Sequence, residues 1–216
     1  MKTPAPLSLG LALALACALA QARPVRIQLF GDSTQWGYDN NTAKPVVQPP
    51  VAVLQAAMDA RFGVGAVVVS ERAASGTTAG QLLAGTDGRN RPWPQEVDAD
   101  IVVVNHGLND NRLQVPIATY KQQLAQLHPT VFETPNPVTA DWASPLYAAA
   151  MREVAAAQHA PVADVDAWMR RQLRWPAMLS DGVHPTPAGY RRIVLKVLMP
   201  TLVPLVVKAM RVASTH

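Results

Sequence analysis

The chain has 216 residues, of which 49% are apolar, 16% charged and 6% aromatic. This composition is too apolar and too weakly charged for a disordered chain, and the length suits one domain with a single core. The single cysteine excludes an internal disulfide and any zinc site built from several cysteines. The net charge of +4 comes from basic residues scattered along the chain, so we expect no nucleic-acid partner.

The N-terminus has the layout of a secretory signal peptide. Residues 7–20 form an apolar run that follows Lys2 and is too short to span a bilayer comfortably. We expect residues 1–22 to be removed by cleavage after Ala22, in preference to Ala20, and residues 23–216 to form the mature domain. The protein would then be exported, to the periplasm or the medium, with no stable membrane insertion after processing.

The only cysteine, Cys17, lies inside this apolar run. An alternative is therefore a lipoprotein anchored through Cys17. The residue three positions before it is Ala14, where lipoproteins usually carry leucine, so we favour the cleaved signal peptide.

After this segment, short β-branched runs alternate with longer stretches of helical period. The expected strands are Val25 to Phe30, Gly65 to Ser70, Ile101 to Asn105, Thr130 to Glu133 and Pro161 to Val165. The expected helices are Pro50 to Arg61, Pro116 to Leu127, Trp142 to Gln158 and a C-terminal helix that begins at Thr186. Five strands alternating with helices predict an α/β fold with a mostly parallel sheet covered on both faces.

The C-terminal helix carries its own start and stop signals. Thr186 is a suitable N-cap, and Pro187 suits the first helical position because its missing N–H costs nothing there. Pro200 and Pro204 are expected to kink or end the helix.

Ligands of parallel sheets bind beyond the carboxyl ends of the strands, so the segments that follow the strands are the candidates for a site. The first strand is followed by Gly31-Asp32-Ser33-Thr34, the second by Ser75-Gly76-Thr77-Thr78 after a short connection, and the third by His106-Gly107-Leu108-Asn109-Asp110. A fourth polar segment, Asp181-Gly182-Val183-His184-Pro185, precedes the last helix and could join them if that helix packs beside the first strand.

These segments supply the parts needed for acyl transfer. A serine hydroxyl such as Ser33 becomes nucleophilic when a neutral imidazole accepts its proton and an acceptor holds the imidazole in one tautomer. Among the five histidines, only His184 has a carboxylate three residues before it, and a tight turn would bring Asp181 back to its ring. The same edge offers oxyanion donors: the N–H of Ser33, the N–H of Gly76 and the side-chain amide of Asn109.

The four segments stand in the order and approximate spacing of the four blocks of the SGNH or GDSL hydrolases, which the chain resembles from residue 25 to about 210. The resemblance implies a three-layer α/β/α domain with a flavodoxin-like, five-stranded sheet. It also implies Ser33 as nucleophile, His184 as base, Asp181 as its partner, and Ser33, Gly76 and Asn109 as the oxyanion hole. It implies neither a cofactor nor a metal.

Two positions depart from the pattern of the family. Members often carry an asparagine about five residues before the block-two glycine, where this chain has Glu71, and Thr34 replaces the common leucine. Neither change removes a catalytic group. The first leaves open how the Gly76 loop is packed.

The substrate is less well specified. Two polar loops, residues 36–50 and 134–142, follow strands at this edge, and their aromatic residues Trp36, Tyr38 and Trp142 could stack on sugar rings or line an acyl pocket. With no long apolar lid in the sequence, we expect a monomeric esterase of small acyl esters, with O-acetyl groups on carbohydrate preferred by analogy. The alternatives are a thioesterase or lysophospholipase on the same triad, and a non-catalytic carbohydrate-binding module of the same fold.

Overall fold

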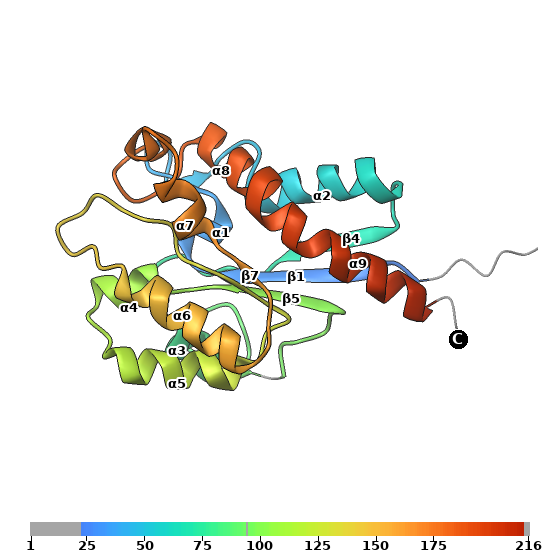
Figure 1. Cartoon of the computed structure of the whole chain (residues 1–216), viewed down its shortest axis with the longest axis horizontal. Helices are drawn as coiled ribbons and strands as arrows, with labels where there is room; N and C mark the ends of the chain where they lie inside the picture. The colour runs from blue at the N-terminus through green and yellow to red at the C-terminus, as the bar shows by residue number, and fades with distance from the viewer. Residues whose placement is uncertain (1–22, 94, 214–216) are drawn as a thin grey trace, which may run out of the picture.

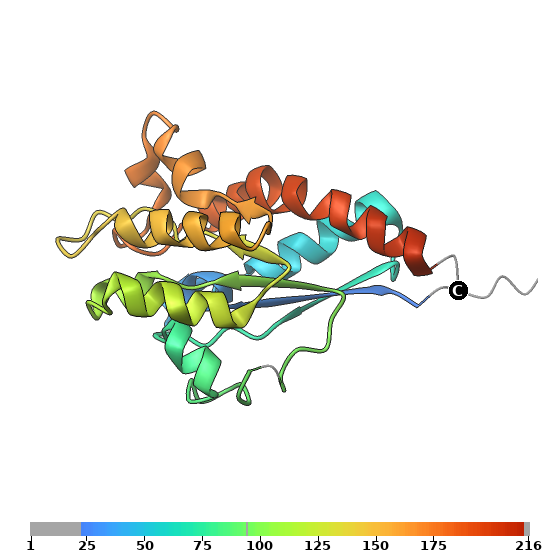
Figure 2. The same ribbon diagram turned by 60° about the horizontal axis from the view of Figure 1, so that its bottom comes forward.

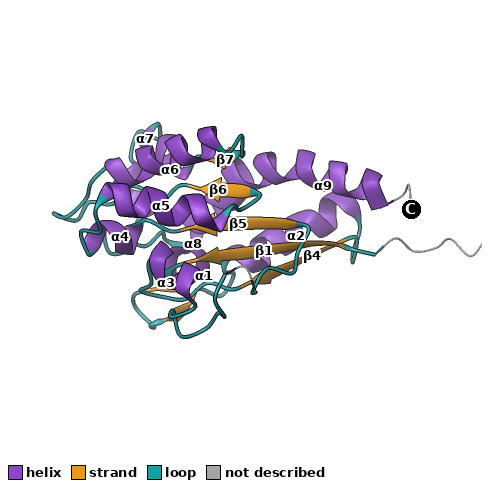
Figure 3. Ribbon diagram, turned by 90° about the horizontal axis from the view of Figure 1, so that it is seen from below, coloured by secondary structure: helices purple, strands orange, loops and turns teal. Residues whose placement is uncertain are grey.

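A computed structural model describes residues 23–93 and 95–213, so the expected signal peptide and Cys17 lie outside the described residues. Five strands form one sheet in the order β4-β1-β5-β6-β7, with every neighbouring pair parallel. The strands are β1 (Val25–Gly31), β4 (Val67–Glu71), β5 (Ile101–Asn105), β6 (Val131–Glu133) and β7 (Val162–Ala163). Figure 3 shows them side by side. The predicted parallel α/β sheet with flavodoxin-like strand order is confirmed.

Helices cover both faces of the sheet (Figure 1), which confirms the three-layer arrangement. One face carries α2 (Pro50–Phe62), α7 (Val165–Arg170), α8 (Pro187–Ile193) and α9 (Met199–Ala213), and the other carries α3 (Ala79–Ala84), α5 (Ile117–Leu127) and α6 (Leu146–Ala157). Two short helices, α1 (Ser33–Trp36) and α4 (Leu108–Arg112), follow β1 and β5 directly, and a 3₁₀ turn spans Trp175–Met178.

Alternation along the strands divides the core into two clusters. Ile27 and Leu29 of β1 pack with the α2 and α9 side, whereas Phe30 packs with α3, α5 and α6. In β5, Val103 belongs to the first cluster and Val104 to the second, and all four of these aliphatic residues and Phe30 are fully buried. Burial on both faces explains the continuous apolar sequence of β5.

The predicted helix over residues 142–158 begins later than expected, at Leu146. Pro145 is the residue before its first turn, and proline restricts the residue before it to non-helical conformations. The loop predicted for residues 36–50 contains a two-stranded antiparallel hairpin, β2 (Tyr38–Asp39) with β3 (Lys44–Pro45).

The C-terminal helix does not end at Pro200 or Pro204, contrary to one of the two expected outcomes. A π-helical turn, Val194–Leu198, lies between α8 and α9 and ends two residues before Pro200. A proline cannot donate to the carbonyl four residues earlier and crowds it, and a π turn widens the helix at that point.

The segment Pro187–Val212 is long and apolar enough to cross a membrane by length and composition, with a mean hydropathy of 1.9 and a third of it buried. Its side chains at Val197, Leu198, Leu202 and Val206 lie in the core. This segment lies beside α2 on one face of the sheet (Figures 1 and 2), so its apolar character serves the packing of the domain.

Candidate active site

Ser33 lies at the carboxyl end of β1, as the first residue of α1. The buried Asp32 caps this helix, and its side chain accepts a hydrogen bond from the Thr34 N–H at 2.9 Å and from the Thr34 hydroxyl at 2.8 Å. The Gly31 backbone approaches the Asn105 carbonyl so closely that a Cβ would lie 2.5 Å from its oxygen. The turn from β1 to α1 therefore favours glycine at position 31 and an N-capping acid at position 32. This turn places Ser33 at the first position of the helix.

His184 and Asp181 form a local unit in the loop before α8. A bridge between Leu179 and Pro185 closes this loop, and the Asp181 carboxylate accepts hydrogen bonds from the backbone N–H groups of Val183 at 2.9 Å and His184 at 2.7 Å. Its other oxygen lies 2.7 Å from the His184 Nδ1. Gly182 has a φ of 81°, which a residue with a side chain adopts at a cost.

The two units meet across the edge of the sheet. His184 Nε2 lies 2.9 Å from Ser33 Oγ, although the residues are 151 positions apart in the chain. Burial acts to raise the pKa of Asp181, but the hydrogen bonds from the His184 ring and the two backbone N–H groups outweigh it and hold that pKa below its ordinary value. A carboxylate that stays ionised can hold the Nδ1 proton, which leaves Nε2 free to accept the proton of Ser33.

Gly76 and Asn109 line the same pocket from the segments that follow β4 and β5, the two strands on either side of β1. Gly76 has a φ of 80°, and nothing lies within 4 Å of the position that a Cβ would take, so conformation rather than space favours glycine. Asn109 is buried in α4, and its side-chain amide donates to the Asp32 carboxylate at 3.3 Å. Since Ser33 begins α1, its N–H has no partner within that helix.

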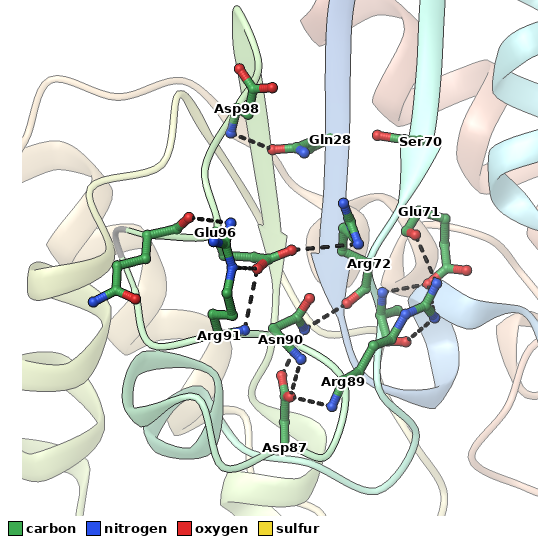
Figure 4. Close-up of polar contacts among 12 residues, drawn as sticks. Gln28, Ser70, Glu71, Arg72, Asp87, Arg89, Asn90, Arg91, Glu96 and Asp98 are labelled. Carbon is green, nitrogen blue, oxygen red and sulfur yellow. Dashed lines mark hydrogen bonds and ion pairs between the residues drawn. The ribbon is translucent and has the colours of Figure 1, made fainter.

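The loop that carries Gly76 is held by a polar network in which Glu71 takes part (Figure 4). Its carboxylate accepts from the Ala73 N–H and, at 2.9 Å, from Arg89. Arg89 also donates to the backbone carbonyls of Ala73 at 2.6 Å and Glu71 at 2.9 Å, and Asn90 donates to the Arg72 carbonyl at 2.9 Å. At the position where the family often has asparagine, this chain has Glu71. Its ion pair with Arg89, together with the hydrogen bonds from Arg89 and Asn90, holds the segment between β4 and Gly76.

A pocket with a volume of about 330 Å³ opens over these groups. Six of the residues singled out from the sequence line it: Ser33, Tyr38, Gly76, Asn109, Trp142 and His184. Asp181 stands directly behind His184, and the Tyr38 ring lies 4.6 Å from the imidazole ring between their centroids. Trp36 is not in the lining, and its ring lies beside Tyr38 with 6.3 Å between the centroids.

Sequence reasoning did not single out five further lining residues, Asn40, Ser75, Leu108, Arg112 and Val183. All five lie within three residues of a predicted site residue, so proximity in the sequence was an available signal. Within the described residues, no group of three or more histidine, cysteine or acidic side chains is placed to hold a metal ion.

The sequence model of the GDSL-like lipase/acylhydrolase family matches residues 29–192, which include every residue of this arrangement. The chain belongs to this family. As a GDSL-like acylhydrolase it is a hydrolase that acts on esters. No curated protein matches the chain.

Solved structures share the fold of this GDSL-like protein. A lipase/acylhydrolase from Enterococcus faecalis has a TM-score of 0.66 at 21% identity, with 82% of this chain and 95% of that one covered. The acetylxylan esterase Axe2 from Geobacillus stearothermophilus has a TM-score of 0.65 at 18% identity, with 84% and 96% covered. LAE5, a hydrolase from the metagenome of Lake Arreo, has a TM-score of 0.64 at 22% identity, with 83% and 95% covered.

Proposed function

We propose that this GDSL-like protein is an exported serine esterase that removes short acyl groups, O-acetyl groups on carbohydrate among them, through a covalent acyl-enzyme. The observation that carries the proposal is the continuous hydrogen-bonded line from Ser33 Oγ through the His184 ring to Asp181, with distances of 2.9 and 2.7 Å. A nucleophile, a base and an orienting acid in this order can start acyl transfer without further groups.

The chemistry divides into two halves. Ser33 Oγ attacks the ester carbonyl while its proton passes to His184 Nε2, and the carbonyl π electrons move to oxygen. The N–H groups of Ser33 and Gly76 and the Asn109 amide stabilise this oxyanion. When the carbonyl re-forms, the bond to the leaving alcohol breaks, and the alcohol oxygen takes the proton from His184.

A water molecule then attacks the acyl-Ser33 ester, again with His184 as base. The second oxyanion collapses with release of the carboxylic acid, and the proton returns from His184 to Ser33 Oγ. Asp181 keeps its negative charge throughout and stabilises the imidazolium that forms in each half.

The lining of the pocket supports short acyl groups. In the described part of the chain, its aliphatic side chains are Leu108 and Val183, and the rings of Tyr38 and Trp142 add further apolar surface. A long acyl chain would need a continuous apolar channel, whereas two aromatic rings beside polar groups suit a sugar. The acetylxylan esterase among the structural neighbours makes acetylated carbohydrate a sensible first substrate to test.

The test of the proposal uses 4-nitrophenyl acetate and a fluorophosphonate probe. We expect Ser33→Ala to abolish hydrolysis and covalent labelling while the protein stays folded. Ser75→Ala, which changes another serine of the same pocket, should keep the labelling. Labelling that persists in Ser33→Ala, or hydrolysis that does, would overturn the assignment.

Export is supported by the basic, apolar and small-residue layout of residues 1–22. Expression of the full chain in a bacterial host should yield a processed protein in the periplasm or medium whose N-terminus follows Ala22. Cys17→Ser should leave its location unchanged, whereas a membrane-bound wild type released by Cys17→Ser would establish the lipoprotein alternative.

A further inference from the structure

One charged side chain lines the pocket beside Ser33 and His184, and the triad chemistry does not use it. Arg112 is the last residue of α4, three positions after Asn109, and is exposed. Within the described residues, it has neither an ion-pair partner nor a side-chain hydrogen bond, in contrast to Arg89, Arg152 and Arg170, which pair with acids. A guanidinium with no acid beside it, at the mouth of a reactive pocket, is free to bind a ligand.

No carboxylate of the lining competes for Arg112. Among residues 23–93 and 95–213, no aspartate or glutamate lines the pocket. The two acids closest to the reacting groups are both engaged, since Asp181 binds the His184 ring and Asp32 accepts from Thr34 and Asn109. The pocket therefore presents one unpaired positive charge.

The acids next to lining residues in the sequence also stay outside the pocket. Asp110, which follows Asn109, is fully buried and accepts a hydrogen bond from the Ala79 N–H. Asp39, between Tyr38 and Asn40, accepts hydrogen bonds from Asn41 and Thr42 within its own turn. Asp141 precedes Trp142 and is not in the lining.

Other residues of the same lining are polar or aromatic. Asn40 and Ser75 offer neutral donors, and the Trp142 ring offers a flat face. Arginine binds a carboxylate through two parallel N–H bonds, which orients the ligand as well as holding it. A substrate with a carboxylate close to its ester would gain this interaction, whereas a neutral ester of the same shape would not.

From this arrangement we infer that the esterase prefers substrates that carry a carboxylate close to the scissile ester, and that Arg112 binds that carboxylate. The inference rests on the proposed ester hydrolysis and narrows its substrate class. The carboxylate could belong to the alcohol, as in an O-acetylated acidic sugar, or to the acyl group, as in a half-ester of a dicarboxylic acid. Both sources present the same group to Arg112.

The experiment uses two matched pairs of esters, with the primary amide as the neutral replacement for the carboxylate. The alcohol-side pair is 3-acetoxypropanoate and 3-acetoxypropanamide, and the acyl-side pair is ethyl hydrogen succinate and ethyl succinamate. In each pair, the ratio of kcat/KM for the carboxylate to that for the amide is measured with the mature domain by titration of released acid.

We expect the wild-type ratio to exceed that of Arg112→Gln by about tenfold in at least one pair, and the pair that responds identifies the side of the ester that carries the charge. Arg112→Glu should lower the ratio further, and 1 M salt should weaken the wild-type preference. Arg171→Gln, at an exposed arginine outside the pocket lining, should keep the wild-type ratio.

Equal ratios for the wild type and Arg112→Gln in both pairs would overturn the inference. If the amide esters are hydrolysed in a Ser33-dependent manner in that case, the proposed esterase function stands and only the preference for carboxylates fails. If no ester of either pair is hydrolysed, the inference fails, and Ser33-dependent hydrolysis of 4-nitrophenyl acetate decides whether the proposed function fails with it.

Discussion

The Asp110 carboxylate accepts a hydrogen bond from the backbone N–H of Ala79, with its two oxygens 3.2 and 3.3 Å from that nitrogen. Both residues are fully buried. Ala79 begins α3, three residues after Gly76, and Asp110 follows Asn109 directly. This contact therefore joins the two segments that would supply two of the three oxyanion donors.

Loss of this contact should impair turnover. Asp110→Ala leaves the Ala79 N–H buried without an acceptor, which costs about 1–3 kcal/mol in the free energy of unfolding. We also expect Asp110→Ala to lower kcat for 4-nitrophenyl acetate, because the segments that carry Gly76 and Asn109 are no longer joined by this contact. In Asp110→Asn the side-chain oxygen can still accept the hydrogen bond, so this variant should keep most of the wild-type kcat. Equal kcat values for wild type and Asp110→Ala would contradict a positioning role.

Gly76→Ala separates backbone strain from catalysis. A Cβ at Gly76 meets open space, so the substitution should destabilise the fold by about 1 kcal/mol through its positive φ alone. Gly65 has the same φ of 80° and the same open surroundings, in the connection before β4. We expect similar losses of stability in both alanine variants, measured by urea unfolding, and a fall in kcat only for Gly76→Ala. A matching fall in Gly65→Ala would attribute the effect to stability.

Asp181→Asn should lower kcat by about 10³- to 10⁴-fold, because an amide can hold the imidazole in the wrong tautomer.

The pKa of Asp181 is lowered in the folded protein, so this group stabilises the fold above its unfolded pKa, and that contribution is lost as the pH falls through the folded pKa. The difference in the free energy of unfolding between wild type and Asp181→Asn should therefore shrink toward acid pH. A difference that stays constant below pH 4 would argue against the linkage.

Glu133 should make the protein less stable at alkaline pH. Burial raises its pKa to about 8, the charge of Asp32 adds to the rise, and its Oε2 has no hydrogen-bond partner within the described residues. An acid with a raised folded pKa binds more protons in the native state, so the free energy of unfolding falls as the pH rises from its unfolded pKa to about 8.

Glu133→Gln removes this ionisation, so the variant should gain on wild type by up to roughly 1.4 kcal/mol per pH unit across that range. Chemical unfolding at pH 5 and at pH 8.5 measures the change. A constant difference between the two proteins at both values would show that Glu133 does not titrate there.

Local sequence signals predicted the parts of this protein that depend on neighbours in the chain. Short β-branched runs marked all five strands, and the fully buried Ile101–Asn105 was predicted with its observed bounds. The pairing of Asp181 with His184 followed from a three-residue spacing. Strand order placed the first three segments at one edge, since β4, β1 and β5 are neighbours.

Other features depended on contacts between distant residues, which no local pattern encodes. Arg89 clamps the loop after Glu71 from 18 positions away, and Asp110 reaches Ala79 across 31. The C-terminal helical segment continues past Pro200 after a π turn, and its apolar side stays packed in the core. The sequence by itself determined the strands, the order of the blocks and the chemical groups they carry. Only the tertiary structure decided that Arg112 faces the same pocket as Ser33, because side chains meet there through the packing of the whole sheet.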